Sequence, residues 1–196
     1  MRAETAGVPA SPALWRAFLV HAAVAGAFGL LTIFWGEPSV HVMSVAGGLY
    51  FLGLAAAVHL TERSLKAQEA VPAWLTRTVP VFLAVAGALN LWIHSDTVFA
   101  GTGVLAFILL GVAYLVVWVK NRGRHVAARD FLLTGVISLL TGALLPMFEA
   151  LGAHALLGIA GGGAVITAVL LALAALSYRH DSRELAGPSG RTKRVN

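Results

Sequence analysis

Histidines and acidic residues offer the most versatile chemistry in this sequence, and their spacing forms a pattern. One acid and one histidine lie in each of three short polar turns: Glu37 with His41, Asp96 with His94, and Glu149 with His154. Histidine gains a proton near neutral pH, so a histidine beside an acid changes the charge of its surroundings as the pH falls. If the three turns meet on one face, these six groups predict an acid-sensing ring. The simpler interpretation, that short turns need solvated polar residues, stays open.

Two further histidines, His21 and His59, lie within apolar stretches. Antiparallel pairing of those stretches would bring the two imidazoles to a similar depth, where they could titrate or bind a metal. Two histidines without a carboxylate or thiolate make a poor metal site, so we predict no metal and no other cofactor. The alternative is that each histidine hydrogen-bonds a neighbouring helix or reaches toward the membrane interface. Asn90 could line a polar path together with His21, or else hold two helices together.

No catalytic motif emerges from the sequence. It lacks a serine elbow, an HExxH metal motif and carboxylates paired on one helix. The chain has no cysteine, which excludes disulfides, thiolate metal sites and cysteine nucleophiles. We therefore expect that the protein is not an enzyme.

Composition places these residues in a membrane. Of 196 residues, 58% are hydrophobic and 12% are charged, and the mean hydropathy is +0.81. Soluble domains carry about 25% charged residues, so an ordinary soluble enzyme, a nucleic-acid-binding domain and a disordered protein are excluded. The net charge of +5 fits a membrane protein whose basic residues set its orientation.

Six apolar windows approach the roughly 20 residues that a helix needs to cross the hydrocarbon. They are Ala17–Trp35, Ser39–Leu60, Thr78–Ile93, Thr97–Val119, Phe131–Phe148 and Ala153–Tyr178. The sequence thus predicts an all-α integral membrane protein with six transmembrane helices. The helices would form one membrane domain over residues 14–179, after an N-terminal segment (1–13) and before a basic, disordered tail (180–196).

The basic residues between the windows indicate the orientation. All 14 lysines and arginines lie before the first window, in the second and fourth loops with the helix starts that follow them, or after the last window. The first, third and fifth loops contain none. The positive-inside rule therefore predicts that both termini are cytosolic. Anionic lipid head groups are the expected partners of the basic loops and tail.

The chain also reads as three helix hairpins, over residues 14–60, 73–119 and 127–179. Arg16, Arg77 and Arg129 open them, and a small or compact residue follows each arginine after thirteen positions: Gly29, Asn90 and Gly142. In the second helices, Gly53, Gly111 and Gly163 occupy similar positions. Internal repeats can build transporters, but small residues also let plain helix bundles pack closely. We expect packing for these glycines and for the spaced pair Gly158 and Gly162.

These features resemble one family. In the last hairpin, Arg129–Arg179, the similarity rests on spaced small residues and a proline turn: Gly135, Gly142, Pro146, Gly158 and Gly163. The first hairpin is similar, with Trp35, Glu37 and Pro38 before Gly47, Gly48 and Gly53. This pattern resembles the HdeD-type acid-resistance family of small six-helix bacterial membrane proteins. The second hairpin departs from it, because Ile93–Thr97 contains no proline.

The resemblance implies a multi-pass protein of the bacterial inner membrane that is associated with acid or envelope stress. Its molecular activity is not defined at family level, and no family site residue can be carried over. We therefore expect a non-enzymatic membrane component. A small transporter with a path between the hairpins is one alternative, and a membrane anchor for a partner is another. A second copy of the chain or another membrane protein remains open as partner, and nucleic acid is not expected.

Overall fold

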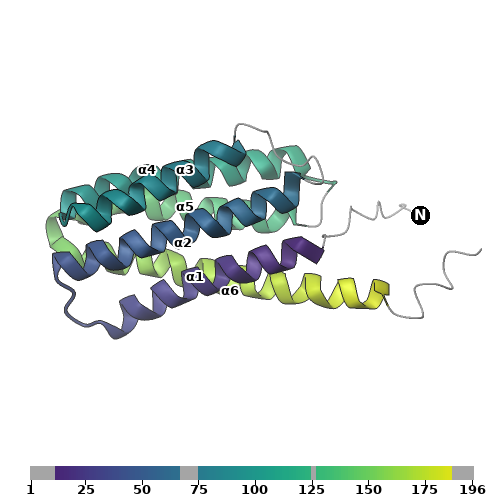
Figure 1. Ribbon diagram of the computed structural model, residues 1–196, viewed down its shortest axis with the longest axis horizontal. Coiled ribbons are helices and arrows are strands. Elements are labelled where there is room, and N and C mark those ends of the chain that lie inside the picture. The colour runs from purple at the N-terminus through teal and green to yellow at the C-terminus, as the bar shows by residue number, and fades with distance from the viewer. Residues whose placement is uncertain (1–11, 67–74, 125–126, 187–196) are drawn as a thin grey trace, which may run out of the picture.

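Every regular element among the described residues is a helix. The computed structural model describes residues 12–66, 75–124 and 127–186 (Figure 1). Its elements are α1 (Pro12–Phe34), α2 (Val40–Lys66), α3 (Leu75–Trp92), α4 (Asp96–Asn121), α5 (Ala128–Phe148), the short 3-10 helix η1 (Glu149–Leu151) and α6 (Gly152–Ala186). The expected all-α fold is confirmed.

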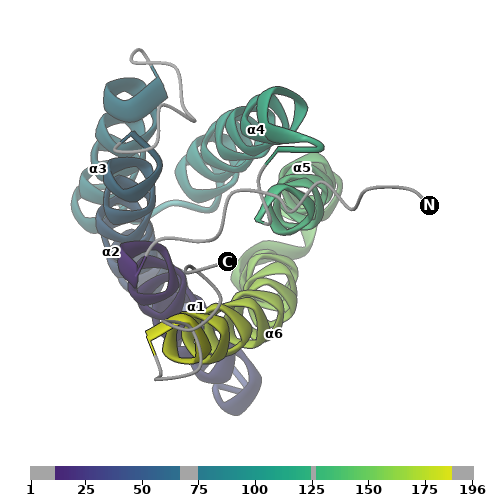
Figure 2. The ribbon, with the colours of Figure 1, turned by 90° about the vertical axis from the view of Figure 1, so that its right-hand side faces the viewer.

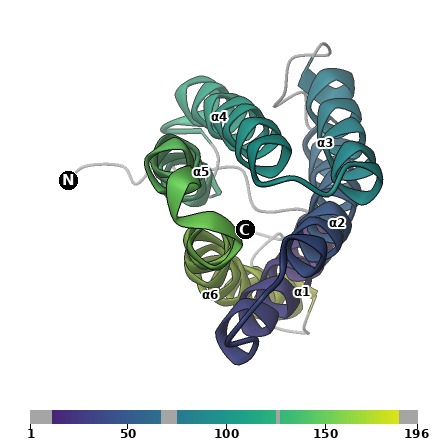
Figure 3. The ribbon, with the colours of Figure 1, turned by 90° about the vertical axis from the view of Figure 1, so that its left-hand side faces the viewer.

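The α-helices form a closed ring in chain order (Figures 2 and 3). Each helix packs against the next one along the chain, and α6 closes the ring against α1. Across the described residues, α2, α4 and α6 also touch one another, whereas α1, α3 and α5 do not. The second helix of each hairpin therefore lies nearer the centre of the ring.

The ring has two distinct ends. The connections α1–α2, α3–α4 and α5–α6 lie at one end, which we call the hairpin end. The start of α1 and the end of α6 lie at the other, which we call the terminal end (Figure 1). We call the interior near the hairpin end the hairpin half, and the interior near the terminal end the terminal half. At the hairpin end, Gly152 has φ +77°, a left-handed conformation that suits glycine between η1 and α6.

The most extensive contacts join helices of different hairpins: α1 with α6, α4 with α5, and α2 with α3. Glycines make two of these approaches possible. A Cβ added to Gly87 would lie 2.8 Å from the Gly48 carbonyl oxygen, and one added to Gly111 would lie 2.8 Å from that of Gly135. Backbones this close leave no room for a side chain, which is how small residues bring membrane helices together.

Not every glycine has the expected role. Gly158 and Gly162 face outward on α6, and a Cβ added to either would meet nothing within 4 Å. The expectation that this pair packs against another helix of the chain is therefore wrong. Gly53 and Gly163 face the first helix of their own hairpin, whereas Gly111 faces α5 of the next hairpin. The three positions that the sequence aligns thus do not share one environment.

Several helices extend beyond the apolar windows that predict them. α2 continues from Leu60 to Lys66, and α6 continues beyond Tyr178 to Ala186. The expected disordered tail therefore begins too early at residue 180, since helix persists to residue 186. Residues 1–11 of the N-terminal segment and 187–196 of the tail lie outside the described residues.

Four segments of the described residues are long and apolar enough to cross a membrane. They are Ala13–Phe34, Val40–Leu65, Asp96–Asn121 and Ala128–Ser182, the last of which contains both α5 and α6. The apolar part of α3, Arg77–Trp92, is shorter. The expectation of membrane-crossing helices is thus confirmed at this level, while six separate crossings stay a prediction.

Candidate functional site

The terminal half of the interior contains a hydrogen bond between two opposite sides of the ring. The Tyr114 hydroxyl of α4 lies 3.3 Å from Nδ1 of His21 on α1. His21 is 1% exposed and Tyr114 is 5% exposed, so both side chains are buried inside the bundle. The structure therefore supports the expectation that His21 bonds a neighbouring helix, with Tyr114 as its partner. His59 is half-buried on α2, and the described contacts of His21 do not include it.

Glu62 is the second feature of this half. It lies in the extension of α2 and is only 6% exposed. Its Oε2 atom is buried and has no hydrogen-bond partner. The carboxyl group also interacts electrostatically with Tyr114. A buried carboxyl group without a partner is costly in an apolar interior, and in membrane proteins such groups mark functional sites.

Asp130 and Tyr178 form a third polar contact in the terminal half. The Tyr178 hydroxyl of α6 donates a hydrogen bond to Oδ2 of Asp130 on α5. The adjacent Arg129 is exposed, and the hydroxyl donor of Asp130 comes from another helix.

Aromatic rings connect these polar groups across the interior. Phe18 of α1 packs edge-on against Phe131 of α5, with ring centroids 5.5 Å apart, and lies 5.9 Å from the Tyr178 ring. Phe131 in turn lies 5.5 Å from the Tyr114 ring. α1 and α5 are not neighbours in the ring, so these side chains fill its centre.

The hairpin half is filled differently. Phe28 of α1 stacks on Tyr50 of α2 with centroids 4.2 Å apart and rings 7° from parallel. Phe51 of α2 contacts Phe99 and Phe107 of α4, with centroids 6.2 and 5.7 Å apart. These five rings, which we call the aromatic cluster, occupy the centre of this half.

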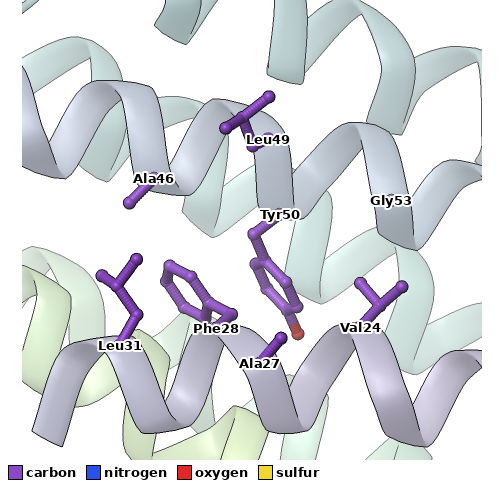
Figure 4. A pocket seen from close by; sticks show the side chains of 8 residues that line it. All are labelled: Val24, Ala27, Phe28, Leu31, Ala46, Leu49, Tyr50 and Gly53. Carbon is purple, nitrogen blue, oxygen red and sulfur yellow. The ribbon is translucent and has the colours of Figure 1, made fainter.

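A groove of about 280 Å³ lies between α1 and α2 beside the aromatic cluster (Figure 4). Its lining is almost wholly apolar: Val24, Ala27, Phe28, Leu31, Ala46, Leu49, Tyr50 and Gly53. Figure 4 shows the Tyr50 side chain reaching from α2 to α1, with its hydroxyl near Ala27. Such a surface suits an apolar chain and offers little to a polar substrate.

Asn90 joins two helices at the hairpin end. Its Nδ2 donates hydrogen bonds to the Ala86 carbonyl, at 2.8 Å, and to Thr102 Oγ1 on α4, at 2.7 Å. Thr102 in turn donates to the Val98 carbonyl at 2.7 Å. Asn90 is fully buried, and its Oδ1 atom has no partner. These bonds support the expectation that Asn90 holds helices together.

The expected ring of acids and histidines is only partly assembled. His41 of α2 stacks on His94, in the α3–α4 turn, with ring centroids 4.3 Å apart. Both imidazoles are exposed. No described contact joins this pair to the other groups of the expected ring, Glu37, Glu149 and His154, and Asp96 keeps a buried Oδ1 without a partner. Within the described residues, no group of three or more acids, histidines or cysteines is placed to hold a metal ion.

The chain shows no match to protein-family models, to curated proteins or to solved structures. The HdeD-type resemblance therefore stays a prediction.

Sequence reasoning missed Glu62 and the two buried tyrosines, Tyr114 and Tyr178. The window Ser39–Leu60 ends where the mean hydropathy falls, which leaves Glu62 in the loop that follows. Two signals were available in the sequence. Glu62 lies eight residues after the buried Leu54, which is close to two helical turns, and no Gly or Pro separates them. A tyrosine within an apolar window also needs a partner for its hydroxyl when it is buried.

Proposed function

We propose that this protein is a six-span, non-enzymatic protein of the bacterial inner membrane with both termini in the cytosol. It serves a structural role in the membrane under acid or envelope stress. The HdeD-type pattern of glycines and prolines supports this assignment, as do the long apolar helices. The contacts among α2, α4 and α6 support an organisation as three hairpins.

The observation that carries the structural role is the filled interior. The aromatic cluster occupies the hairpin half, and rings from α1, α5 and α6 meet in the terminal half. Asn90, which would line the path in the transporter alternative, is bonded to Thr102 at a helix contact. A transporter of polar solutes needs a continuous polar route, and the aromatic cluster interrupts it.

Proteoliposomes test this proposal. Purified protein in vesicles loaded with a pH-sensitive dye, with acid outside, should show proton and small-ion flux no greater than that of empty vesicles. Flux above that background, reduced by His21→Ala or Asn90→Leu, would contradict the structural role and favour a transporter.

The arginines and tryptophans of the terminal end support its cytosolic orientation. The guanidinium groups of Arg16 and Arg179 lie 5.4 and 5.5 Å from the Trp15 ring centre, and that of Arg122 lies 5.8 Å from the Trp118 ring centre. Tryptophan and arginine together suit the head-group region, where anionic lipids attract basic side chains. Trp74 and the basic residues of the tail beyond residue 186 lie outside the described residues.

The orientation has a direct test, because the chain has no cysteine. In intact cells, Ser39→Cys and Ser95→Cys at the hairpin end should react with a membrane-impermeant thiol reagent. Arg124→Cys at the terminal end should react only after the cells are opened. The reverse pattern would contradict the proposed topology.

A small transporter remains the second candidate, and the polar groups of the terminal half favour it. Glu62, His21 and Tyr114 provide ionisable and hydroxyl groups inside the ring. The flux measurement decides between the two functions.

A further inference from the structure

Glu62 differs from Asp130, another carboxyl group of the terminal half. Asp130 accepts a hydrogen bond from Tyr178, whereas Oε2 of Glu62 is buried and has no donor. A carboxyl group removed from water needs a proton, a hydrogen-bond donor or a positive charge to be stable. The pairing of Asp130 shows that this half can satisfy a carboxylate with a hydroxyl. At Glu62 it does not.

Among the side chains that the structure describes, the charged and titratable groups around Glu62 do not supply a counter-charge; the Lys66 side chain, one turn further along α2, lies outside them. The helices packed against α2 are α1, α3, α4 and α6. In the terminal half they contribute His21 and Arg16 from α1, Arg77 from α3, Tyr114 and Lys120 from α4, and Tyr178 and Arg179 from α6. On α2 itself, His59 is half-buried and Arg63 is exposed. The ion pair that the structure gives among its described residues joins His180 and Asp181, so none of these basic groups is paired with Glu62.

Tyr114 is the group that couples to Glu62. The two interact electrostatically, and the Tyr114 hydroxyl also contacts His21 on the opposite side of the ring. The charge on the Glu62 carboxyl therefore acts on the same hydroxyl whose contact joins α4 to α1.

We propose that Glu62 is a proton-binding site within the terminal half of the bundle, coupled to α1 through Tyr114 and His21. A hydronium ion at the terminal end gives up a proton, which breaks its O–H bond, leaves water and forms an O–H bond on the Glu62 carboxylate. The carboxylate becomes a neutral acid. Proton binding thus removes a negative charge that acts on the Tyr114 hydroxyl, and so changes the electrostatic environment of the contact between α1 and α4.

A proton suits this site better than a metal cation. Sodium and other small cations bind to several oxygen atoms at once, and Oε2 of Glu62 has no hydrogen-bond partner among the described side chains. No described group of three or more acids, histidines or cysteines could hold a metal ion here. The proposal concerns binding and does not depend on transport or on the stress role.

Infrared difference spectroscopy tests the proposal. The full-length protein in lipid vesicles is compared between alkaline and acidic buffer. We expect the carbonyl band of a buried carboxylic acid, which shifts when water is replaced by D₂O. Glu62→Gln should abolish this band. Tyr114→Phe should change the frequency of this band without removing it, because the variant lacks the hydroxyl that interacts electrostatically with Glu62 while the acid itself remains.

Matched variants make the outcome decisive. Asp130→Asn removes the other carboxyl group of the terminal half and should leave the band in place. Glu62→Asp keeps a carboxyl group and should move the band, which preserves the test if Glu62→Gln does not fold. A band that survives in Glu62→Gln, or its absence from the wild type at every pH, would overturn the proposal. Loss of the acid band on adding sodium at constant pH would also overturn it, in favour of a metal cation site. None of these results bears on the flux measurement, so the two proposals fail separately.

Discussion

The hairpin half and the terminal half of the bundle fill the same ring of helices with different chemistry. The aromatic cluster of the hairpin half consists of Phe28, Tyr50, Phe51, Phe99 and Phe107. In the terminal half, rings alternate with polar contacts between Tyr114 and His21 and between Tyr178 and Asp130. The aromatic cluster contains no acid or histidine. The polar contacts of the terminal half include a histidine and an aspartate, which can gain or lose a proton. The stability of the bundle should therefore depend mainly on the hairpin half, and its response to pH on the terminal half.

Phe51→Ala should have the largest effect on this comparison. Phe51 is fully buried and contacts three other rings, so truncation leaves a cavity and costs about 3–5 kcal/mol of unfolding free energy. Denaturation of the purified protein in mixed micelles measures the loss. Phe34→Ala is the matched control, because Phe34 is 82% exposed and should change stability little. Equal losses in the two variants would remove the special role of the aromatic cluster.

Glycine-to-alanine changes test whether the helix contacts between hairpins are equally close in the two halves. Gly87→Ala in the hairpin half and Gly111→Ala in the terminal half each place a Cβ 2.8 Å from a carbonyl oxygen of the facing helix. Overpacking of this kind costs about 1–3 kcal/mol, and the two losses should be similar. Gly158→Ala, where nothing lies within 4 Å, should be neutral or slightly stabilising because alanine favours helix. A loss confined to one half, measured by the same denaturation, would mean that the interfaces are not equivalent.

Tyr178→Phe tests the polar contacts of the terminal half. It removes the hydroxyl that donates to Asp130 and should cost about 1 kcal/mol, in the range of hydrogen bonds between membrane helices. Tyr50→Phe, in the aromatic cluster, keeps the stacked ring and should cost less. If Tyr50→Phe costs more unfolding free energy than Tyr178→Phe in the denaturation experiment, the contrast between the two halves is wrong.

The stacked histidines at the hairpin end should give the smallest effect. Both rings are exposed, and their centroids are 4.3 Å apart. A variant with His41→Ala and His94→Ala should lose less unfolding free energy than Tyr178→Phe, because no buried side chain is removed. A larger loss in the same denaturation experiment would mean that this pair, and not the terminal half, holds the stronger contact.

The sequence predicts the fold far better than the interior. Long apolar windows are sufficient for the helices, because spanning length and hydropathy are properties of each segment alone. Which side chains meet across the ring is a property of the closed bundle. The Tyr114–His21 contact joins residues 93 positions apart, and no periodicity within one helix indicates it.

The boundaries fail where polar residues continue an apolar helix. Glu62 was left out because the hydropathy falls after Leu60, yet the backbone of α2 stays helical to Lys66. The turn residues show a second limit of prediction from sequence, which concerns contacts between separate turns. Pattern alone placed one acid and one histidine in each turn, but only His41 and His94 come into contact. Distances between separate turns depend on how the hairpins pack, which the sequence does not state.

The closure of the ring has a consequence for how the protein is made. The most extensive helix contact joins α1, the first described helix to leave the ribosome, with α6, the last. While the other helices are synthesised, the face of α1 that α6 will cover has only lipid or an insertion factor beside it. A Cβ added to Gly29 would collide with Val165 of α6, so the place that Val165 takes on this glycine stays empty until then. A chain that stalls before α6 is therefore an incomplete ring with two open edges.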